Sequence, residues 1–132
     1  MKLAPKKFYI ATSLGNVAEH HRVRDWLVAH GHTITVDWTE MESLKSTDGT
    51  EKLMERAVVD LEGVYQADVV VVLLPGGAGT HVELGAALAR RKEVWMFGQH
   101  KEPYRCVFHY HPDVGYFPGV DPIRLLERAF KP

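Results

Sequence analysis

A glycine-rich segment lies directly before an acidic residue, Glu83, and reads Pro-Gly-Gly-Ala-Gly-Thr from residue 75 to residue 80. Glycine lets the backbone approach a ligand closely, and a helix that begins there offers unpaired N–H groups with a partial positive charge. A phosphate or a sugar hydroxyl could bind to such a segment. The candidate binding residues are Gly76, Gly77, Gly79 and Thr80. A tight turn between a strand and a helix explains the same glycines without a ligand, and no Gly-Lys-Ser/Thr sequence follows that would make a P-loop.

Two carboxylates could carry the chemistry of a site beside this segment. Glu83 follows Thr80 by three residues, which fits a capping box in which each side chain bonds the other's backbone. The alternative is a carboxylate that points into a crevice. Asp60 flanks the apolar stripe of a second expected helix, so it is either a solvated edge residue or a second acid of the same site.

Further candidates follow the first two expected strands. Ser13 and Gly15 could bind an anion through a hydroxyl and backbone N–H groups, although both are common turn residues. Asp37 and Trp38 offer an acceptor and an aromatic face to a flat heterocycle, although a partly buried tryptophan is the more frequent situation. The eight histidines lack the carboxylate or cysteine spacing of a zinc site, so we expect no metal.

Short β-like runs alternate with helical patterns along the chain, which predicts an α/β domain with a parallel sheet. The expected strands are Phe8–Thr12, Thr33–Val36, Val69–Leu74, Val94–Phe97 and Cys106–Phe108. Four helices are expected. The first ends near His30, and the second runs from a Thr50 cap to about Ala67. The third runs from about His81 to Arg91, and the fourth from Ile123 to Phe130 after an Asp121-Pro122 start. These elements predict one doubly wound domain over residues 1–132, with a ligand site beyond the carboxyl ends of the strands.

Composition excludes several classes of function. The 132 residues carry a net charge of −1, which does not favour binding to a nucleic acid polymer. The single cysteine, Cys106, excludes an internal disulfide framework. The apolar run Val69–Leu74 is far shorter than the ~20 residues of a membrane span. No signal-peptide pattern is evident near the start, so we expect a cytoplasmic protein with no membrane contact.

The sequence from Gly79 to Leu88, with Asp60-Leu61-Glu62-Gly63-Val64 and Ala67-Asp68-Val69-Val70-Val71 before it, resembles the nucleoside 2-deoxyribosyltransferase family and its relatives that hydrolyse nucleoside 5′-monophosphates. The resemblance implies a flavodoxin-like, Rossmann-like subunit with a five-stranded doubly wound parallel sheet, which assembles into homodimers or larger oligomers. It also implies roles for three residues: Glu83 as nucleophile, Asp60 as acid/base, and Tyr9 as the tyrosine that orients the glutamate. No cofactor or metal is implied.

Residues 75–83 also fit the Pro-Gly-Gly-x-Gly-Thr-x-x-Glu signature of cytokinin-activating phosphoribohydrolases, which break the same type of bond, but the upstream arginine-rich signature is not evident. Gly77 stands where deoxyribosyltransferases carry a sugar-binding aspartate, and Ser13 stands where the hydrolases keep a phosphate-binding serine. These two positions favour a hydrolase that cleaves the N-glycosidic bond of a (deoxy)nucleoside 5′-monophosphate. The alternatives are base exchange by a deoxyribosyltransferase and a non-catalytic nucleotide-binding or sensing module.

The mechanism implied by this resemblance makes specific structural demands. The helix start should keep Glu83 ionised, and Tyr9 should donate a hydrogen bond to it. The Gly76–Thr80 segment and Ser13 should hold the 5′-phosphate, while Asp37 and Trp38 meet the base. Small residues between Gly85 and Ala89 favour close helix pairing in a homodimer, and the segment from His109 to Val120 could close over a neighbouring subunit's site.

Overall fold

The central strand of the sheet is β3 (Val69–Leu73), and all five of its residues are buried. Its unbroken β-branched run suits a strand that is covered on both faces. The structure, a computed structural model, describes residues 4–98 and 106–130. The other strands are β1 (Lys7–Ala11), β2 (Thr33–Ile34), β4 (Glu93–Phe97) and β5 (Val114–Phe117). All pairings are parallel and the strand order is β2-β1-β3-β4-β5.

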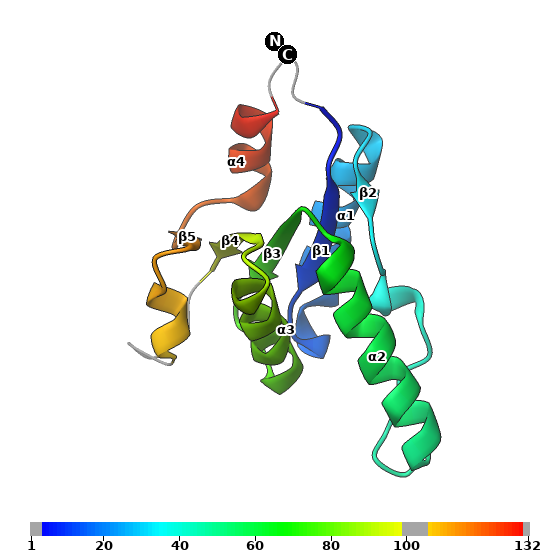
Figure 1. Ribbon diagram of the computed structural model, residues 1–132. Helices are drawn as coiled ribbons and strands as arrows, with labels where there is room; N and C mark the ends of the chain where they lie inside the picture. The colour runs from blue at the N-terminus through cyan, green and yellow to red at the C-terminus, as the bar shows by residue number, and fades with distance from the viewer. Residues whose placement is uncertain (1–3, 99–105, 131–132) are drawn as a thin grey trace.

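Helices cover both faces of this sheet (Figure 1). One face packs against α1 (Val17–Ala29) and α4 (Pro122–Ala129), and the other against α2 (Thr50–Gln66) and α3 (Ala78–Ala89). The short 3₁₀ helices are η1 (Leu14–Asn16), η2 (Trp38–Glu40) and η3 (Val107–Tyr110). The prediction of a doubly wound, flavodoxin-like sheet in one domain is therefore confirmed.

Four local predictions are wrong. The fifth strand is Val114–Phe117, whereas Cys106–Phe108 lies at the start of η3, because the chain closes a tight turn there with His109 N–H donating to the Cys106 carbonyl. The second strand ends at Ile34 because only its first residues pair with β1. Gly49, and not Thr50, is the N-cap of α2, and α3 begins at Ala78 rather than near His81.

The start of α4 agrees with its sequence signal. Asp121 is the N-cap, its carboxylate accepts a hydrogen bond from the Ile123 N–H at 3.0 Å, and Pro122 opens the helix. Among residues 4–98 and 106–130, no helix combines the length and the apolar character that crossing a membrane requires.

Candidate active site

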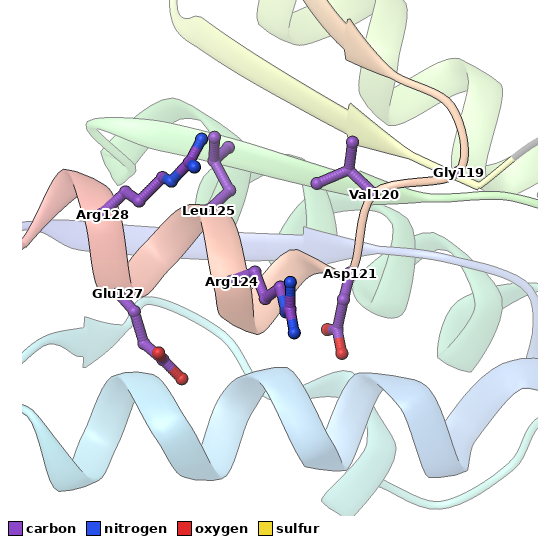
Figure 2. Close-up of a pocket in the computed structure, with 7 residues that line it drawn as sticks. All are labelled: Gly119, Val120, Asp121, Arg124, Leu125, Glu127 and Arg128. Carbon is purple, nitrogen blue, oxygen red and sulfur yellow. The ribbon is translucent and has the colours of Figure 1, made fainter.

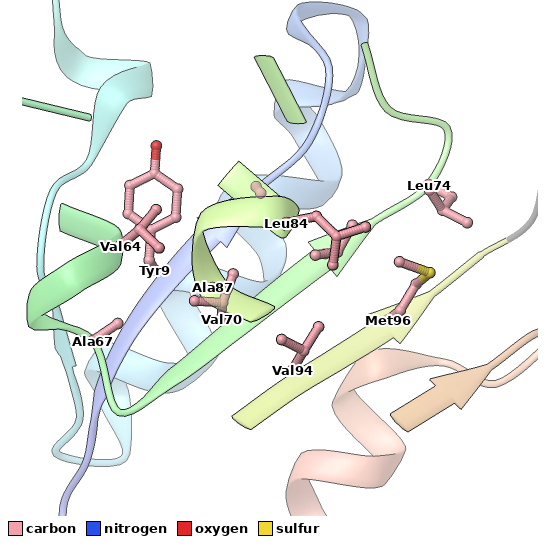
Figure 3. Packing of buried hydrophobic residues seen from close by; sticks show 11 residues of the cluster. Tyr9, Val64, Ala67, Val70, Leu74, Leu84, Ala87, Val94 and Met96 are labelled. Atoms are coloured by element: carbon pink, nitrogen blue, oxygen red, sulfur yellow. The ribbon is translucent and has the colours of Figure 1, made fainter. Parts of the chain in front are cut away.

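A partly buried hydrogen bond joins the sheet to α3. Tyr9 lies on β1, is fully buried, and its hydroxyl donates to the Glu83 carboxylate. Figure 3 shows the Tyr9 ring standing off the strand beside Val64 of α2, within the apolar cluster under α2 and α3. A Cβ atom at Gly63 would lie 2.9 Å from the Tyr9 ring and 2.8 Å from the Val36 side chain. Glycine at this position therefore lets α2 approach the tyrosine that holds Glu83.

Burial sets the ionisation of Glu83. It raises the pKa of Glu83 to about 7, the hydrogen bond from Tyr9 acts to lower it, and the nearby charge of Asp60 raises it further. The expectation that a helix start keeps Glu83 ionised is wrong, because α3 begins at Ala78 and Glu83 lies in the second turn, where the dipole is weak. Burial and the neighbouring Glu83 also raise the pKa of Tyr9, so its hydroxyl keeps its proton as a donor.

Asp60 provides the second acid of the cluster from α2. Burial raises its pKa, and the positive charge of Arg56 opposes this rise. Its Oδ1 atom is buried and has no hydrogen-bond partner among the described residues. Because a buried unpaired acceptor is unfavourable, such an atom suggests a position kept for a ligand or a reacting group.

Asp60 also lines a pocket of about 450 Å³ between α2 and the segments that follow β1 and β2. Its lining consists of Leu14, Val17, Trp38, Thr39, Met41, Glu42, Ser43, Leu44, Leu53, Arg56 and Asp60. This volume falls in the usual range for small-molecule sites. Glu83 is not part of this lining, so the pocket meets the acid cluster at Asp60.

Arg56 is a residue that the sequence analysis missed. Within the described part of the chain it is the only cation of the pocket lining, and its guanidinium donates to the Glu42 carbonyl at 2.6 Å. The available signal was its position one turn before Asp60 on the same helix.

The glycine-rich segment forms the turn into α3. Of the two alternatives for Glu83, the capping box with Thr80 is not formed: the Thr80 hydroxyl accepts from the Gly77 N–H at 3.1 Å, and the Glu83 carboxylate accepts from Tyr9. A Cβ at Gly76 would lie 2.7 Å from the Thr80 methyl group, so this close turn requires glycine. Ala78 and Gly79 are exposed, and the first N–H groups of a helix lack partners within it.

Ser13 and Gly15 lie at the same edge of the sheet as this turn, because β1 and β3 are parallel neighbours. Ser13 precedes η1 and its side chain makes no capping bond, while Gly15 is exposed within η1. The two loops are tied together by Thr12, whose hydroxyl donates to the Leu73 carbonyl at 2.7 Å. Nothing in the sequence pattern marked Thr12, since a threonine at a strand end has many uses.

Asp37 and Trp38 are neighbours in the sequence but have different roles in the structure. The Trp38 indole N–H donates to the Ile10 carbonyl at 2.8 Å, and the residue lines the pocket. Asp37 is not in that lining: its carboxylate accepts from Arg24 at 3.0 Å and from the Thr39 N–H at 3.0 Å. Although burial acts to raise its pKa, the hydrogen bonds from Thr39 and Arg24 lower it. Asp37 therefore organises η2 rather than the pocket.

A larger hollow of about 790 Å³ lies on α4 and the segment before it (Figure 2). Its charged residues are Asp121, Arg124, Glu127 and Arg128, of both signs. Because α4 and α3 pack on opposite faces of the sheet, this hollow lies away from Glu83. The hollow on α4 is therefore separate from the cluster of Tyr9, Asp60 and Glu83.

Solved structures with the same fold include two enzymes. The CMP N-glycosidase BcmB of Clostridium botulinum superposes with a TM-score of 0.65 at 18% identity, over 94% of this chain and 98% of that one. A 2-deoxyribosyltransferase from Bacillus psychrosaccharolyticus gives a TM-score of 0.64 at 23% identity, over 84% and 85%. A conserved protein from Enterococcus faecalis V583 superposes with a TM-score of 0.56 at 18% identity, over 95% of this chain and 88% of that one.

No curated protein sequence matches the chain. The sequence model described as nucleoside 2-deoxyribosyltransferase matches residues 8–118, a span that contains Tyr9, Asp60, Glu83 and the glycine-rich turn. The members of this family and the two named structural neighbours are enzymes that act on nucleosides or nucleotides. The chain belongs to the nucleoside 2-deoxyribosyltransferase family.

Proposed function

We propose that this protein is an N-glycosidase that cleaves the bond between base and sugar in a (deoxy)nucleoside 5′-monophosphate. The observation that carries the proposal is the acid cluster: Glu83 held by the Tyr9 hydroxyl, with Asp60 close enough to raise its pKa. The family match and the likeness to a CMP N-glycosidase support this class of reaction.

Glu83 is the proposed nucleophile. Departure of the base builds positive charge at the anomeric carbon, which a carboxylate stabilises and then bonds, as in retaining glycosidases. The resulting ester between Glu83 and the sugar is then hydrolysed by water. Tyr9 fixes one carboxylate oxygen and leaves the other to attack.

Asp60 is the proposed acid and base. It protonates the leaving base, directly or through a water molecule, and then takes a proton from the water that releases the sugar. The charge of Asp60 raises the pKa of Glu83, so the proton that the two acids share favours Glu83. Before the base leaves, this proton moves from Glu83 to Asp60, directly or through water. The ionised Glu83 then stabilises the cationic sugar, and Asp60 gives the proton to the departing base.

Phosphate and base have separate proposed positions. The exposed residues Ala78 and Gly79 at the start of α3, and Ser13 at the same edge of the sheet, offer N–H groups and a hydroxyl to an anion. Trp38 offers its ring to the base in the pocket that Asp60 also lines. Gly77 supplies no carboxylate near the sugar, which favours a nucleotide substrate over a free deoxynucleoside.

The test is the release of free base from a panel of ribo- and deoxyribonucleosides and their 5′-monophosphates, measured by chromatography. We expect release from at least one monophosphate and no release by Glu83→Gln. Glu127→Gln, at an exposed position of α4, is the matched control and keeps wild-type turnover. Equal turnover by Glu83→Gln and the wild type would overturn the nucleophile assignment.

Base exchange is the second candidate, because the family model and one structural neighbour are deoxyribosyltransferases. The same glycosyl-enzyme gives transfer when a second base reacts in place of water. Adding a second nucleobase to the assay distinguishes the two, since a transferase forms a new nucleoside. Thermal stabilisation by nucleotides without any base release indicates a binding module instead.

We also propose that the chain forms a homodimer through α2 and α3. The N-terminal half of α2 extends beyond the sheet (Figure 1), where Met54 and Val58 are 64% and 68% exposed. Val82 on the neighbouring α3 is 60% exposed. Sedimentation of the wild type should give a dimer, and Val58→Glu should give a monomer; a monomeric wild type contradicts this proposal.

A further inference from the structure

Three metal-binding side chains meet at the start of α3. His81 comes from the first turns of this helix, and Cys106 and His109 come from the turn that contains η3. One ligand atom from each lies within 4.8 Å of those of the other two. His109 is almost fully buried, while His81 and Cys106 are half-buried, so the cluster is partly open to solvent.

A backbone carbonyl orients the His81 ring, as is usual for histidines that bind metals. Its Nδ1 atom lies 2.8 Å from the Gly77 carbonyl oxygen, which can only accept, so Nδ1 carries the proton. The neutral ring then presents the lone pair of Nε2 to the cluster. A hydrogen bond from the second ring nitrogen to a carbonyl is the usual support of a metal-binding histidine.

The other two ligands are also held in place. The His109 N–H donates to the Cys106 carbonyl at 3.1 Å, which keeps both residues on one tight turn. The His109 ring packs edge-on against Tyr116 of β5 and lies parallel to the His81 ring, with centroids 5.1 Å apart in the second case. Its Nε2 atom lies 2.8 Å from that of His81.

We propose that His81, Cys106 and His109 bind a zinc ion through His81 Nε2, His109 Nε2 and the Cys106 thiolate. Two imidazoles and one thiolate form a donor set that zinc accepts, with a water molecule as the fourth tetrahedral ligand. The ion fastens η3 to the first turns of α3, next to the glycine-rich turn. This site is independent of the proposed N-glycosidase reaction.

Binding requires small movements and the loss of one proton. In a tetrahedral site two nitrogen ligands stand roughly 3.3 Å apart, so the two rings separate slightly and the thiolate moves toward them. Zinc replaces the Cys106 thiol proton, which passes to solvent. The His109 proton, which His109 Nε2 donates to His81 Nε2 before zinc binds, moves to Nδ1, so that Nε2 can bind the ion. Affinity therefore falls as the pH falls.

The sequence analysis missed this site because it looked for zinc ligands only at short spacings along the chain. The spacing Cys106-x-x-His109 was present, but the third ligand lies 28 residues before His109 and reaches it only through the fold. His111 is the C-cap of η3 and is outside the cluster.

The test uses full-length protein, free of any histidine tag and treated with a chelator. Isothermal titration with Zn²⁺ should show one ion bound per chain, and Co²⁺ should give the thiolate charge-transfer band and intense visible bands of a tetrahedral complex. Cys106→Ser should weaken Zn²⁺ binding by at least about tenfold and remove the charge-transfer band. His111→Gln is the matched control and should bind as the wild type does.

Three results would overturn the proposal: no binding by the wild type, a cobalt spectrum without thiolate bands, or equal binding by Cys106→Ser. Circular dichroism of each variant shows whether it is folded. If Cys106→Ser does not fold, His81→Ala, at a half-buried position, is the second variant. It should weaken Zn²⁺ binding by a similar factor.

Discussion

Phe8 and Tyr9 are neighbours on β1, are equally buried, and face opposite sides of the sheet. Phe8 packs edge-on against Trp95 and Phe130, with ring centroids 5.8 Å and 6.0 Å away. Tyr9 binds a carboxylate. Aromatic rings therefore pack on the α1/α4 side of the sheet. On the α2/α3 side, small residues such as Ala11 and Ala87 lie around titratable groups.

This difference shows how one fold can provide both stability and reactivity. On the α1/α4 side, burial of aromatic rings contributes favourable free energy of folding. On the α2/α3 side, burial raises the pKa of Glu83 and leaves an oxygen of Asp60 unpaired, both of which oppose folding. Substitutions in the aromatic packing of the first side should therefore change stability alone, while those of the acids on the second side should change activity.

Asp60→Asn should give the largest change. Loss of the proposed acid should lower kcat by roughly 10²–10⁴-fold with little change in the free energy of unfolding. Removal of the Asp60 charge should also lower the pKa of Glu83 and move the acid limb of the rate profile to lower pH. Glu62→Gln, at an exposed position of the same helix, is the control. An unchanged kcat would remove Asp60 from the mechanism.

Phe8→Ala should lower stability and leave kcat unchanged, which is the opposite of Asp60→Asn. Loss of a buried ring costs about 3–5 kcal/mol of unfolding free energy, measured by urea denaturation. The folded fraction should keep its kcat, because the ring contacts only the α1/α4 side. Phe8→Leu tests the same point if the alanine variant does not fold. A selective loss of kcat would contradict the separation of the two sides.

Stability should depend on pH in opposite ways for Glu83 and His20. The pKa of Glu83 is raised to about 7, so the folded protein holds this proton more tightly than the unfolded chain does. The free energy of unfolding of the wild type therefore falls by on the order of 3 kcal/mol as pH rises from about 4.5 to 7. His20 on α1 is fully buried, and burial lowers its pKa to about 4. Stability therefore falls by a similar amount as pH drops from about 6.5 to 4.

Denaturation across pH measures both slopes. Glu83→Gln should remove the loss of stability between pH 4.5 and 7, and His20→Leu the loss between pH 6.5 and 4. Asp37 lies near His20 and holds its own charge through Arg24, so it is left unchanged in this comparison. Identical profiles for a variant and the wild type would show that its group does not titrate as described.

Tyr9→Phe should give the smallest of these effects. The Tyr9 hydrogen bond acts to lower the pKa of Glu83, so its loss should move the acid limb of kcat/KM above pH 7. At pH 7 we expect about a tenfold loss, with partial recovery at higher pH. Tyr65→Phe on α2 is the control, since Tyr65 lies beneath the Arg90 guanidinium and outside the acid cluster.

Much of this architecture could be predicted from local patterns. The β-branched run from Val69 and the Asp121-Pro122 helix start depend on neighbouring residues alone, and both are confirmed. The false fifth strand shows the limit, because the apolar pattern of Cys106–Phe108 does not distinguish a strand from a tight turn.

The candidate site was predictable to a smaller degree. A family resemblance brought Tyr9, Asp60 and Glu83 together, and spacing alone could not have done so. The role of Asp37 depends on its hydrogen bonds with Arg24 and Thr39, and the raised pKa of Glu83 depends on its burial. Both are properties of packing, which a single sequence does not display.

The most direct measurement is mass spectrometry of the protein quenched during turnover of a nucleoside monophosphate that it cleaves. The account predicts a sugar phosphate attached to the peptide that contains Glu83, absent from Glu83→Gln and lost with time as water releases it. An active enzyme that forms no such adduct, and whose product has inverted configuration at the anomeric carbon, would contradict the covalent role of Glu83.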